Sequence, residues 1–235
     1  MTHPSSFEPR HPLDAVICVF WERGFAEASY EDLAEASGVG RKGLYAAFGN
    51  KETMFGFALR RYRQLFVASL LSDLRNPDIR LADIAHLLRE IGGFLASKEG
   101  RIGCLMANTA LDDVLKVPAV RLQVVEHLKF MSTTFAAALR RCGVTEEPSS
   151  RLSDYLTGTL QGLFVLGRAQ AGRQMITNCT RTAIAAISLP MSSTGMGAGT
   201  EDPSGDPQQL LPGFEKFRSM TIQRRRFSEM VAKRI

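Results

Sequence analysis

The sequence predicts an all-α protein, with a small amino-terminal helical domain followed by a larger helical domain. Apolar residues recur at spacings of three and four positions over most of residues 13–188, which is typical of helices that bury one face. No stretch alternates apolar and polar residues for long enough to suggest a strand. The composition is that of a globular chain, because 45% of the 235 residues are hydrophobic and 23% are charged.

The amino-terminal domain is expected to begin with three helices, each indicated by a local sequence pattern. The apolar stripe of the first helix falls at Leu13, Val16, Ile17, Phe20 and Trp21. Ser29, with Asp32 three positions later, resembles a capping box and predicts a short helix that ends at Gly38. A second short helix is predicted over residues 41–48, because glycines flank it on both sides.

Two short helices joined by a glycine turn, after an amphipathic helix, form a helix-turn-helix module. Asn50 is expected to cap a long helix that begins at Lys51 and stops at Asn76-Pro77. The same apolar periodicity then predicts four further helices, over residues 84–95, 118–142, 149–172 and 175–188.

The composition changes after residue 189. Gly, Pro, Ser and Thr dominate residues 190–213, so we expect a disordered linker there. Residues 214–234 allow two interpretations, a terminal docking helix or a loosely ordered basic tail, and the ends of chains favour the second. The apolar anchors available to a docking helix are Phe214, Phe217, Phe227 and Met230.

The sequence lacks the segments and motifs that mark several classes of protein, which disfavours those classes. No apolar run approaches the ~20 residues of a membrane span, and residues 1–12 lack the apolar core of a secretory signal. No Gly-rich phosphate loop, HExxH or GxSxG motif occurs, so we expect no enzyme, no metal and no cofactor. The cysteines form no metal or disulfide pattern and favour a cytoplasmic setting, since they are scattered at Cys18, Cys104, Cys142 and Cys179.

The net charge of +5 does not by itself indicate a nucleic-acid partner. Residues 1–60 carry six basic and eight acidic residues, whereas residues 214–235 carry seven basic and two acidic residues. The last 22 residues therefore supply a surplus equal to that of the whole chain. A prediction of DNA binding has to rest on local pattern.

That local pattern lies in the second short helix. Its solvent side offers Arg41, Lys42 and Tyr45, which suit guanine edges, phosphates or a thymine methyl group, while Leu44 and Phe48 face the core. The glycines leave room where a duplex would approach closest, and the helix amino-termini direct N–H groups towards phosphate oxygens. The candidate DNA-binding residues are Ser29, Tyr30, Gly40, Arg41, Lys42, Gly43, Tyr45 and Lys51.

The segment G-V-G-R-K-G-L-Y-A-A-F-G-N-K-E resembles the recognition segment of the TetR/AcrR family of bacterial repressors. Leu44, Tyr45, Phe48, Lys51 and Glu52 fall on the family's positions, as do residues 21–25 (W-E-R-G-F). Gly40 replaces the commoner serine of the turn. The resemblance is specific over residues 10–60, weaker through residue 189, and absent over residues 190–235.

The resemblance implies a DNA-binding domain over residues 1–55 and a ligand-binding and dimerisation domain over residues 56–189, before the tail at 190–235. It implies a homodimeric repressor that reads a palindromic operator with two recognition helices and is released by a small-molecule inducer. The helices at 149–172 and 175–188 would form the dimer interface. Three glycines there indicate close helix approach, across the dimer or within one subunit: Gly158, Gly162 and Gly167.

The sequence indicates the residues of the inducer site less clearly than those of the DNA-binding helix. Cys104 lies in a G-C-L segment that resembles one branch of the family, in which the cysteine is modified by electrophiles or oxidants. A buried core thiol is the alternative, and we favour it. A methionine and aromatic lining suits an apolar or aromatic inducer, although each residue alone is more often plain core. The candidate ligand-binding residues are Cys104, Asn108, His127, Met131, Tyr155, Phe164 and Arg168, with Met106 beside them.

The main alternative function is a helical protein-interaction adaptor that does not bind DNA specifically. The two functions differ in salt dependence, because affinity for duplex DNA falls steeply as the salt concentration rises.

Overall fold

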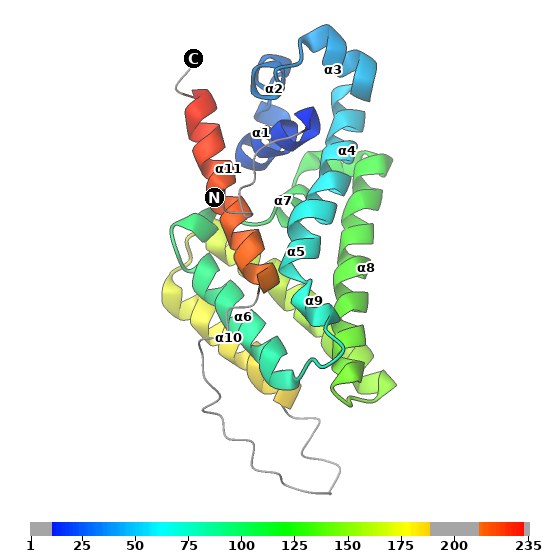
Figure 1. Cartoon of the computed structure of the whole chain (residues 1–235), viewed down its shortest axis with the longest axis vertical. Helices are drawn as coiled ribbons and strands as arrows, with labels where there is room; N and C mark the ends of the chain where they lie inside the picture. The colour runs from blue at the N-terminus through cyan, green and yellow to red at the C-terminus, as the bar shows by residue number, and fades with distance from the viewer. Residues whose placement is uncertain (1–10, 189–211, 233–235) are drawn as a thin grey trace, which may run out of the picture.

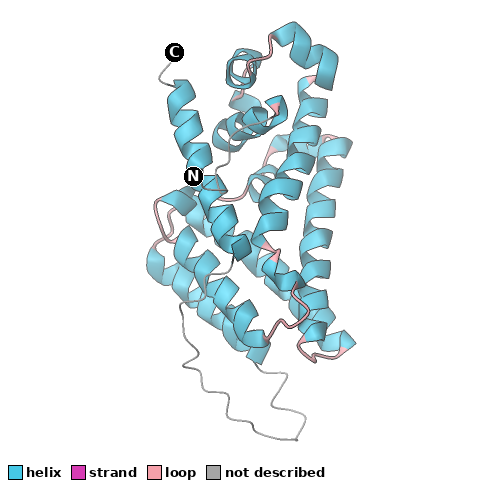
Figure 2. Cartoon of the chain, in the orientation of Figure 1, coloured by secondary structure: helices cyan, strands magenta, loops and turns pink. Residues whose placement is uncertain are grey.

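The computed structural model describes residues 11–188 and 212–232 and, within the last helix, side chains through Arg224. In these ranges the chain forms helices and connecting loops only, which confirms the all-α prediction (Figure 2). None of the helices described there is long and apolar enough to cross a membrane.

The elements divide into a head, α1–α4, and a body, which runs from η1 to α10. The head consists of α1 (Pro12–Glu27), α2 (Tyr30–Ser37), α3 (Arg41–Phe48) and α4 (Lys51–Tyr62). The body consists of the π-helical turn η1 (Arg63–Val67), α5 (Ala68–Leu70), η2 (Asp73–Arg75), α6 (Leu81–Leu95), η3 (Glu99–Ile102), α7 (Leu105–Ala110), η4 (Asp113–Lys116), α8 (Pro118–Arg141), α9 (Glu146–Arg168) and α10 (Arg173–Ser188).

The predicted helix ends in the head are confirmed. Ser29 and Asp32 form a full capping box at the start of α2, and Gly38 ends that helix in the left-handed conformation with φ of 68°. Asn50 caps α4 by accepting a hydrogen bond from the backbone N–H of Thr53. These are local interactions within three residues, which is why the sequence alone located them.

The long helix predicted from Lys51 is interrupted rather than continuous. It widens into the π-helical turn η1 directly after α4 and reaches Arg75 only through the short elements α5 and η2. The stop predicted at Asn76-Pro77 is correct, and α4 runs across the domain boundary that we expected between residues 55 and 56.

The body is built on two pairs of neighbouring helices. The hairpin of α8 and α9 forms one pair, and α6 and α10 lie side by side as the other (Figure 1). Gly92 of α6 allows the second pair to approach closely, because a Cβ at that position would collide with the side chain of Thr180. The predicted range 149–172 becomes α9, which ends at Arg168 because the chain turns at Gln170 and Gly172, with φ of 54° and 89°.

The carboxy-terminal segment corrects our interpretation of the tail. Residues 212–232 form α11 (Pro212–Ala232), which lies along α1, α5 and α6 and carries the chain back to the end where α2 lies (Figure 1). Phe214 and Phe217 are buried. The loosely ordered alternative is therefore wrong for residues 212–224, because these rings find a receiving surface on the body. Of the linker predicted over residues 190–213, residues 190–211 lie outside the described residues and residues 212–213 begin α11. The side chains of Phe227 and Met230 also lie outside the described residues.

Candidate nucleic-acid interface and ligand site

The helices α2 and α3 stand together at one end of the molecule (Figure 1). In α3 only Leu44 is fully buried and Phe48 is half-buried, so the helix rests on one narrow face. Arg41, Lys42 and Tyr45 are exposed on its other sides, and 62% of Tyr45 is accessible to solvent. A helix held in this way presents its polar side chains to a partner outside the chain.

Aromatic packing supports the end of the head behind α3. Phe20 of α1 lies edge-on to Phe55 of α4, with ring centroids 4.7 Å apart, and Phe25 lies 5.2 Å from the same ring. Leu33 of α2 and Leu44 of α3 are both completely buried in this core. Burial of such side chains contributes on the order of 1.5–3 kcal/mol each, so α2 and α3 are held mainly by apolar contact.

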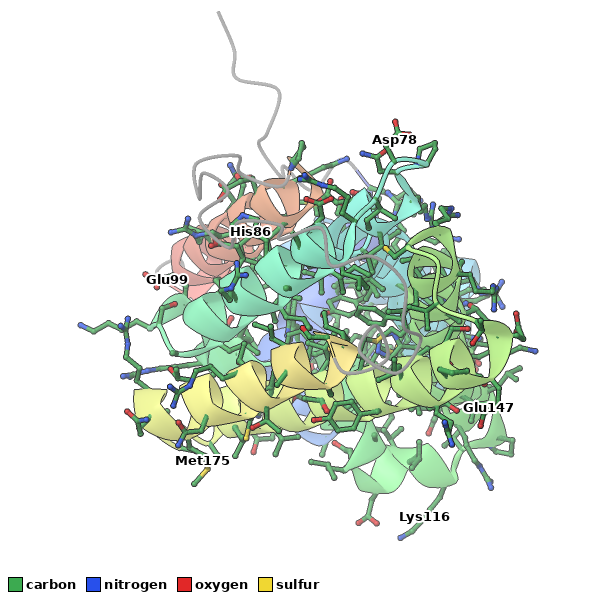
Figure 3. The ribbon with its side chains drawn as sticks, turned by 90° about the horizontal axis from the view of Figure 1, so that it is seen from below. Asp78, His86, Glu99, Lys116, Glu147 and Met175 are labelled. Carbon is green, nitrogen blue, oxygen red and sulfur yellow. The ribbon has the colours of Figure 1, made fainter. Side chains whose placement is uncertain are left out.

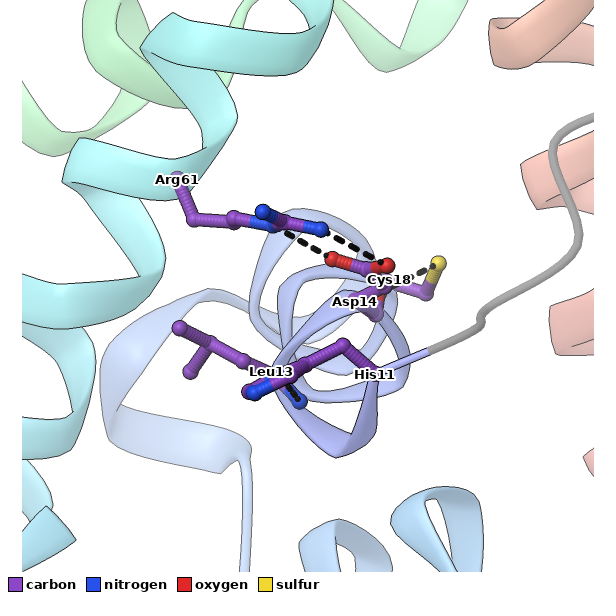
Figure 4. Close-up of polar contacts among 5 residues, drawn as sticks. All are labelled: His11, Leu13, Asp14, Cys18 and Arg61. Carbon is purple, nitrogen blue, oxygen red and sulfur yellow. Dashed lines mark hydrogen bonds and ion pairs between the residues drawn. The ribbon is translucent and has the colours of Figure 1, made fainter.

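A bidentate ion pair also joins α1 to α4 (Figure 4). Arg61 donates from Nε to Oδ1 of Asp14 at 2.8 Å and from Nη2 to Oδ2 at 3.3 Å. Asp14 is buried, and the backbone carbonyl of the same residue accepts a hydrogen bond from the thiol of Cys18. The parallel geometry of two hydrogen bonds fixes the direction of α4 relative to α1.

Arg41 has only weak contacts inside the chain. Its guanidinium carbon lies 5.1 Å from the ring centroid of Tyr30, and Nη1 lies 3.5 Å from Oε1 of Glu31. Both charged side chains of this ion pair are more than two-thirds exposed, and exposed pairs contribute ~1 kcal/mol or less. Arg41 can therefore exchange Glu31 for a phosphate or a base edge at little cost.

Ser29 and Lys51, by contrast, already use their polar atoms within the head. The hydroxyl of Ser29 donates to Oδ2 of Asp32 and accepts from the backbone N–H of Asp32. Although burial opposes it, the hydrogen bonds from Ser29 and the charge of Arg23 hold the pKa of Asp32 below its usual value. The ammonium of Lys51 donates to the carbonyl of Ala26 at 3.2 Å and lies over the ring of Phe25. These two candidates thus have structural contacts of their own.

The two glycines among the candidate DNA-binding residues differ. A Cβ at Gly43 would lie 2.8 Å from Cγ1 of Val39, so this glycine makes room for the turn between α2 and α3. A Cβ at Gly40 would meet nothing within 4 Å. Only Gly40 is left without a reason inside the chain for lacking a side chain.

The candidate ligand residues do not gather in one place. Asn108 and Arg168 both donate to the carbonyl of Ile102, at 3.2 and 3.1 Å, and so hold the end of η3. Tyr155 lies on the outer face of α9 with 41% of its surface exposed. Neither set faces the interior between α8 and α9.

Cys104 is a core residue in this structure. Only 2% of its surface is exposed, and its sulfur accepts a hydrogen bond from the hydroxyl of Tyr62 at 3.4 Å. Burial raises the pKa of the Cys104 thiol, which outweighs the hydrogen bonds that lower it. A buried, protonated thiol lacks both conditions for reaction with an electrophile, so the core alternative that we favoured agrees with the surroundings.

His127 and Met131 of α8 meet Gln161 of α9 in the interior. The amide Nε2 of Gln161 lies 3.4 Å from Nε2 of His127 and 3.2 Å from Sδ of Met131. Because a thioether sulfur only accepts hydrogen bonds, the amide nitrogen must face it, and Nε2 of His127 must accept as well. The proton of the neutral ring therefore resides on Nδ1. Phe164 is buried one turn further along α9.

Three buried polar atoms in this region have no hydrogen-bond partner among the described residues: Nδ1 of His127, Oε1 of Gln123 and Oγ1 of Thr157. Burial, with a smaller contribution from the charge of Arg63, lowers the pKa of His127 to about 4, so the ring is neutral at pH 7. The sequence analysis missed Gln123, Thr157 and Gln161. The available signal was that Gln123 lies one turn before His127, on the buried face of α8.

The three glycines of α9 differ in what surrounds them. A Cβ at Gly167 would crowd Leu95 of α6 at 3.2 Å, so that glycine serves packing inside the subunit. Gly158 and Gly162 are exposed, and a Cβ at either would meet nothing within 4 Å. The same face carries the exposed apolar side chain of Val165, and Met175 of α10 points away from the helices at the edge of the body (Figure 3).

Two family models match the chain. One, described as bacterial regulatory proteins of the tetR family, matches residues 13–56, and the other, described as the LmrA/YxaF-like transcriptional regulator carboxy-terminal domain, matches residues 81–182. The first covers most of the head and the second covers most of the body.

Curated relatives point the same way. The chain is 34% identical to the HTH-type transcriptional repressor ComR of Escherichia coli over 109 residues, which are 45% of this chain and 50% of ComR. It is 25% identical to the uncharacterized HTH-type transcriptional regulator YezE of Bacillus subtilis over 60% of this chain and 73% of YezE. The matched part of the chain thus spans half the length of ComR.

One solved structure similar to this chain is a cysteine mutant of the TetR family transcriptional regulator CifR, complexed with 26-base-pair operator DNA. The two share 28% identity and a TM-score of 0.65 over 78% of this chain and 99% of CifR. Consecutive family models, related HTH-type regulators and a shared all-helical architecture together show that the chain belongs to the TetR family of bacterial regulatory proteins.

Proposed function

We propose that this chain is a ligand-responsive repressor, which binds palindromic operator DNA as a homodimer and is released from DNA by a small-molecule inducer. The observation that carries the proposal is α3, which presents Arg41, Lys42 and Tyr45 at the free end of the head. The similarity to CifR in its complex with operator DNA supports the same role for this helix.

The three exposed side chains suit different parts of a duplex. The guanidinium of Arg41 can donate to O6 and N7 of guanine in the major groove, and Lys42 can neutralise a phosphate. Tyr45 can donate its hydroxyl to phosphate or contact a thymine methyl group with its ring. Tyr30, under the guanidinium of Arg41, is placed to limit the directions that this side chain takes.

The outer face of α9 and α10 supports the homodimer. Tyr155 and Val165 flank Gly158 and Gly162 there, which gives an apolar surface with a bare backbone that a second copy could approach closely. Dimers of twofold symmetry use one such patch on each copy. Two heads related by this symmetry would read half-sites about one helical turn apart.

The interior between α8 and α9 supports an inducer that is mostly apolar and carries one neutral polar group. Nδ1–H of His127 offers a hydrogen-bond donor, and Oε1 of Gln123 offers an acceptor one helical turn away. A hydroxyl group can accept from the first and donate to the second. To release DNA, such a ligand must favour the released form, with a coupling typically of ~1–3 kcal/mol.

Fluorescence anisotropy tests the DNA-binding role. The probe is a labelled duplex from the region upstream of the protein's own gene, titrated with the full chain at several salt concentrations. We expect affinity to fall steeply with salt and Arg41→Ala or Tyr45→Ala to cost on the order of 1–3 kcal/mol. Arg140→Ala is the control for Arg41→Ala, because it also removes one exposed positive charge, but from the last turn of α8.

Equal affinity of wild type and both α3 variants, with circular dichroism unchanged, would contradict DNA reading by α3 and favour the adaptor. Light scattering tests the dimer separately. Gly162→Arg places a long charged side chain on the open face of α9 and should give monomers or aggregates, whereas a monomeric wild type at micromolar concentration would remove the basis for palindrome reading.

A further inference from the structure

The helix α11 lies beyond both family models. The family models end at residue 182, and the described part of α11 begins at Pro212. Its contacts nevertheless reach both parts of the molecule, since α11 packs against α5, α6 and η1 of the body and against α1 of the head (Figure 1).

The amino-terminal end of α11 is fixed to the body. The backbone N–H groups of Gly213 and Phe214 donate to the carboxylate of Asp73 at 3.0–3.2 Å. A carboxylate at a helix amino-terminus satisfies free N–H groups and interacts favourably with the helix dipole. Phe214 and Phe217 then pack against Phe94 of α6, with ring centroids 6.4 and 5.8 Å apart from it.

The other end of the described side chains is fixed to the head. The guanidinium carbon of Arg224 lies 5.1 Å from the ring centroid of Trp21, and its Nη1 lies 3.8 Å from Oε2 of Glu22. The side chain of Arg224 is 3% exposed. A desolvated guanidinium held over an indole ring is a strong form of cation–π contact.

Trp21 is itself central to the junction between head and body. Its ring lies edge-on to Tyr62, the last residue of α4, at 4.8 Å and to Phe66 of η1 at 5.0 Å. Arg224 therefore contacts α1 at the point where the head rests on the first turn of the body. The charge of Arg224 also opposes the effect of burial on Cys18, the pKa of which still rises to about 12.

From this arrangement we propose that α11 is a strap that sets the angle of the DNA-reading head on the body, and that Arg224 is the positioning residue that fastens it to α1. The head also meets the body where α1 contacts α7 and where Trp21 lies against Phe66, but α4 is the helix that continues directly into the body. The attachment of α11 to α1, to one side of α4, adds a contact that opposes rotation of the head about α4. In a dimer, even a small rotation of each head moves the two α3 helices out of register with successive major grooves.

Paired substitutions on α11 test the proposal in the full-length chain. Arg224→Gln and Arg218→Gln each remove one positive charge from the same helix, but Arg218 is half exposed and, among the described residues, its ion pair is with Glu215 of α11 itself. We expect Arg224→Gln to weaken binding to the upstream duplex by up to roughly thirtyfold, the equivalent of one desolvated cation–π contact, and Arg218→Gln to match wild type. Arg224→Lys, which keeps the cation, should recover most of the loss.

Asp73→Ala provides a second variant should Arg224→Gln fail to fold. It frees the opposite end of the strap and makes the chain more positive, so a simple charge effect predicts tighter DNA binding. The strap predicts weaker binding, and tighter or unchanged binding by Asp73→Ala would overturn it. Equal losses from Arg224→Gln and Arg218→Gln would do the same, because they would assign α11 a purely electrostatic part.

Hydrogen exchange separates failure of the strap from failure of the proposed DNA function, because it needs no DNA. We expect Arg224→Gln to speed amide exchange in α1–α3 while leaving α9 and α10 as in wild type. Unchanged exchange in the head would overturn the strap even if DNA binding holds. A wild-type chain that bound no DNA, with the exchange result as expected, would contradict the repressor and leave the strap supported.

Discussion

The basic residues of α3 and the arginines that hold α1 against α4 and α11 have similar side chains but opposite surroundings. Arg41 and Lys42 extend into solvent with at most one weak ion pair. Arg61 and Arg224 are fixed by a bidentate carboxylate and by an indole ring, respectively. The comparison teaches that position in the tertiary structure, and not residue type, separates a side chain that is available to a partner outside the chain from one that holds the protein together.

The largest expected effect concerns the ion pair between α1 and α4. Arg61→Met should lower the free energy of unfolding by about 3 kcal/mol, because it leaves the buried carboxylate of Asp14 without its cation. Arg41→Met, the matched substitution on α3, should change it by less than ~1 kcal/mol. Urea denaturation monitored by circular dichroism measures both variants. Equal stability of the two would mean that the exposed and buried arginines do not differ as the contacts indicate.

His127 extends the comparison to the body interior. Its pKa is lowered to about 4 by burial and by Arg63, while an unfolded histidine titrates near 6.5. The unfolded chain therefore binds more protons between these values, so the stability that the neutral ring provides is present above pH 6.5. This contribution to the free energy of unfolding falls by about 3 kcal/mol in total as the pH drops to 4. His127→Leu should flatten this part of the stability profile, and an unaltered profile would contradict the assignment.

Lys42 and Lys51 sharpen the comparison within one residue type. Lys42→Met should reduce the slope of log affinity against log salt by about 1, with stability unchanged, because it removes one phosphate contact. Lys51→Met should leave that slope unchanged and lower the free energy of unfolding by up to ~1 kcal/mol, through loss of its contacts with Ala26 and Phe25. Anisotropy titrations at several salt concentrations measure the slope for both variants, and urea denaturation measures their free energies of unfolding.

The smallest expected effect lies at Gly40, the N-cap of α3. Gly40→Ser should stabilise the chain by a few tenths of a kcal/mol, because a serine at an N-cap accepts a hydrogen bond that glycine cannot. A Cβ fits there without contact, so lost DNA affinity in this variant would show that the duplex approaches the bare backbone. Gly43→Ala is the comparison variant, since it strains the turn itself against Val39.

Much of the head could be predicted from the sequence because its signals are local. The capping box at Ser29, the cap at Asn50 and the burial of Leu44 all depend on neighbours within a few positions. The exposure of Arg41 and Tyr45 follows from the same helical periodicity. These features, with the family resemblance that they carry, were determined by the sequence alone.

Only the tertiary structure decided which polar groups form hydrogen bonds or ion pairs with distant residues. Asp14 meets Arg61 across 47 positions, Gly213 meets Asp73 across 140, and the burial of Cys104 depends on Tyr62 from another helix. A pattern of three or four residues holds no information about such pairs, because they form when packed helices bring distant residues together. For the same reason α11 could not be distinguished from a loose tail until Phe94 and Trp21 were seen to receive it.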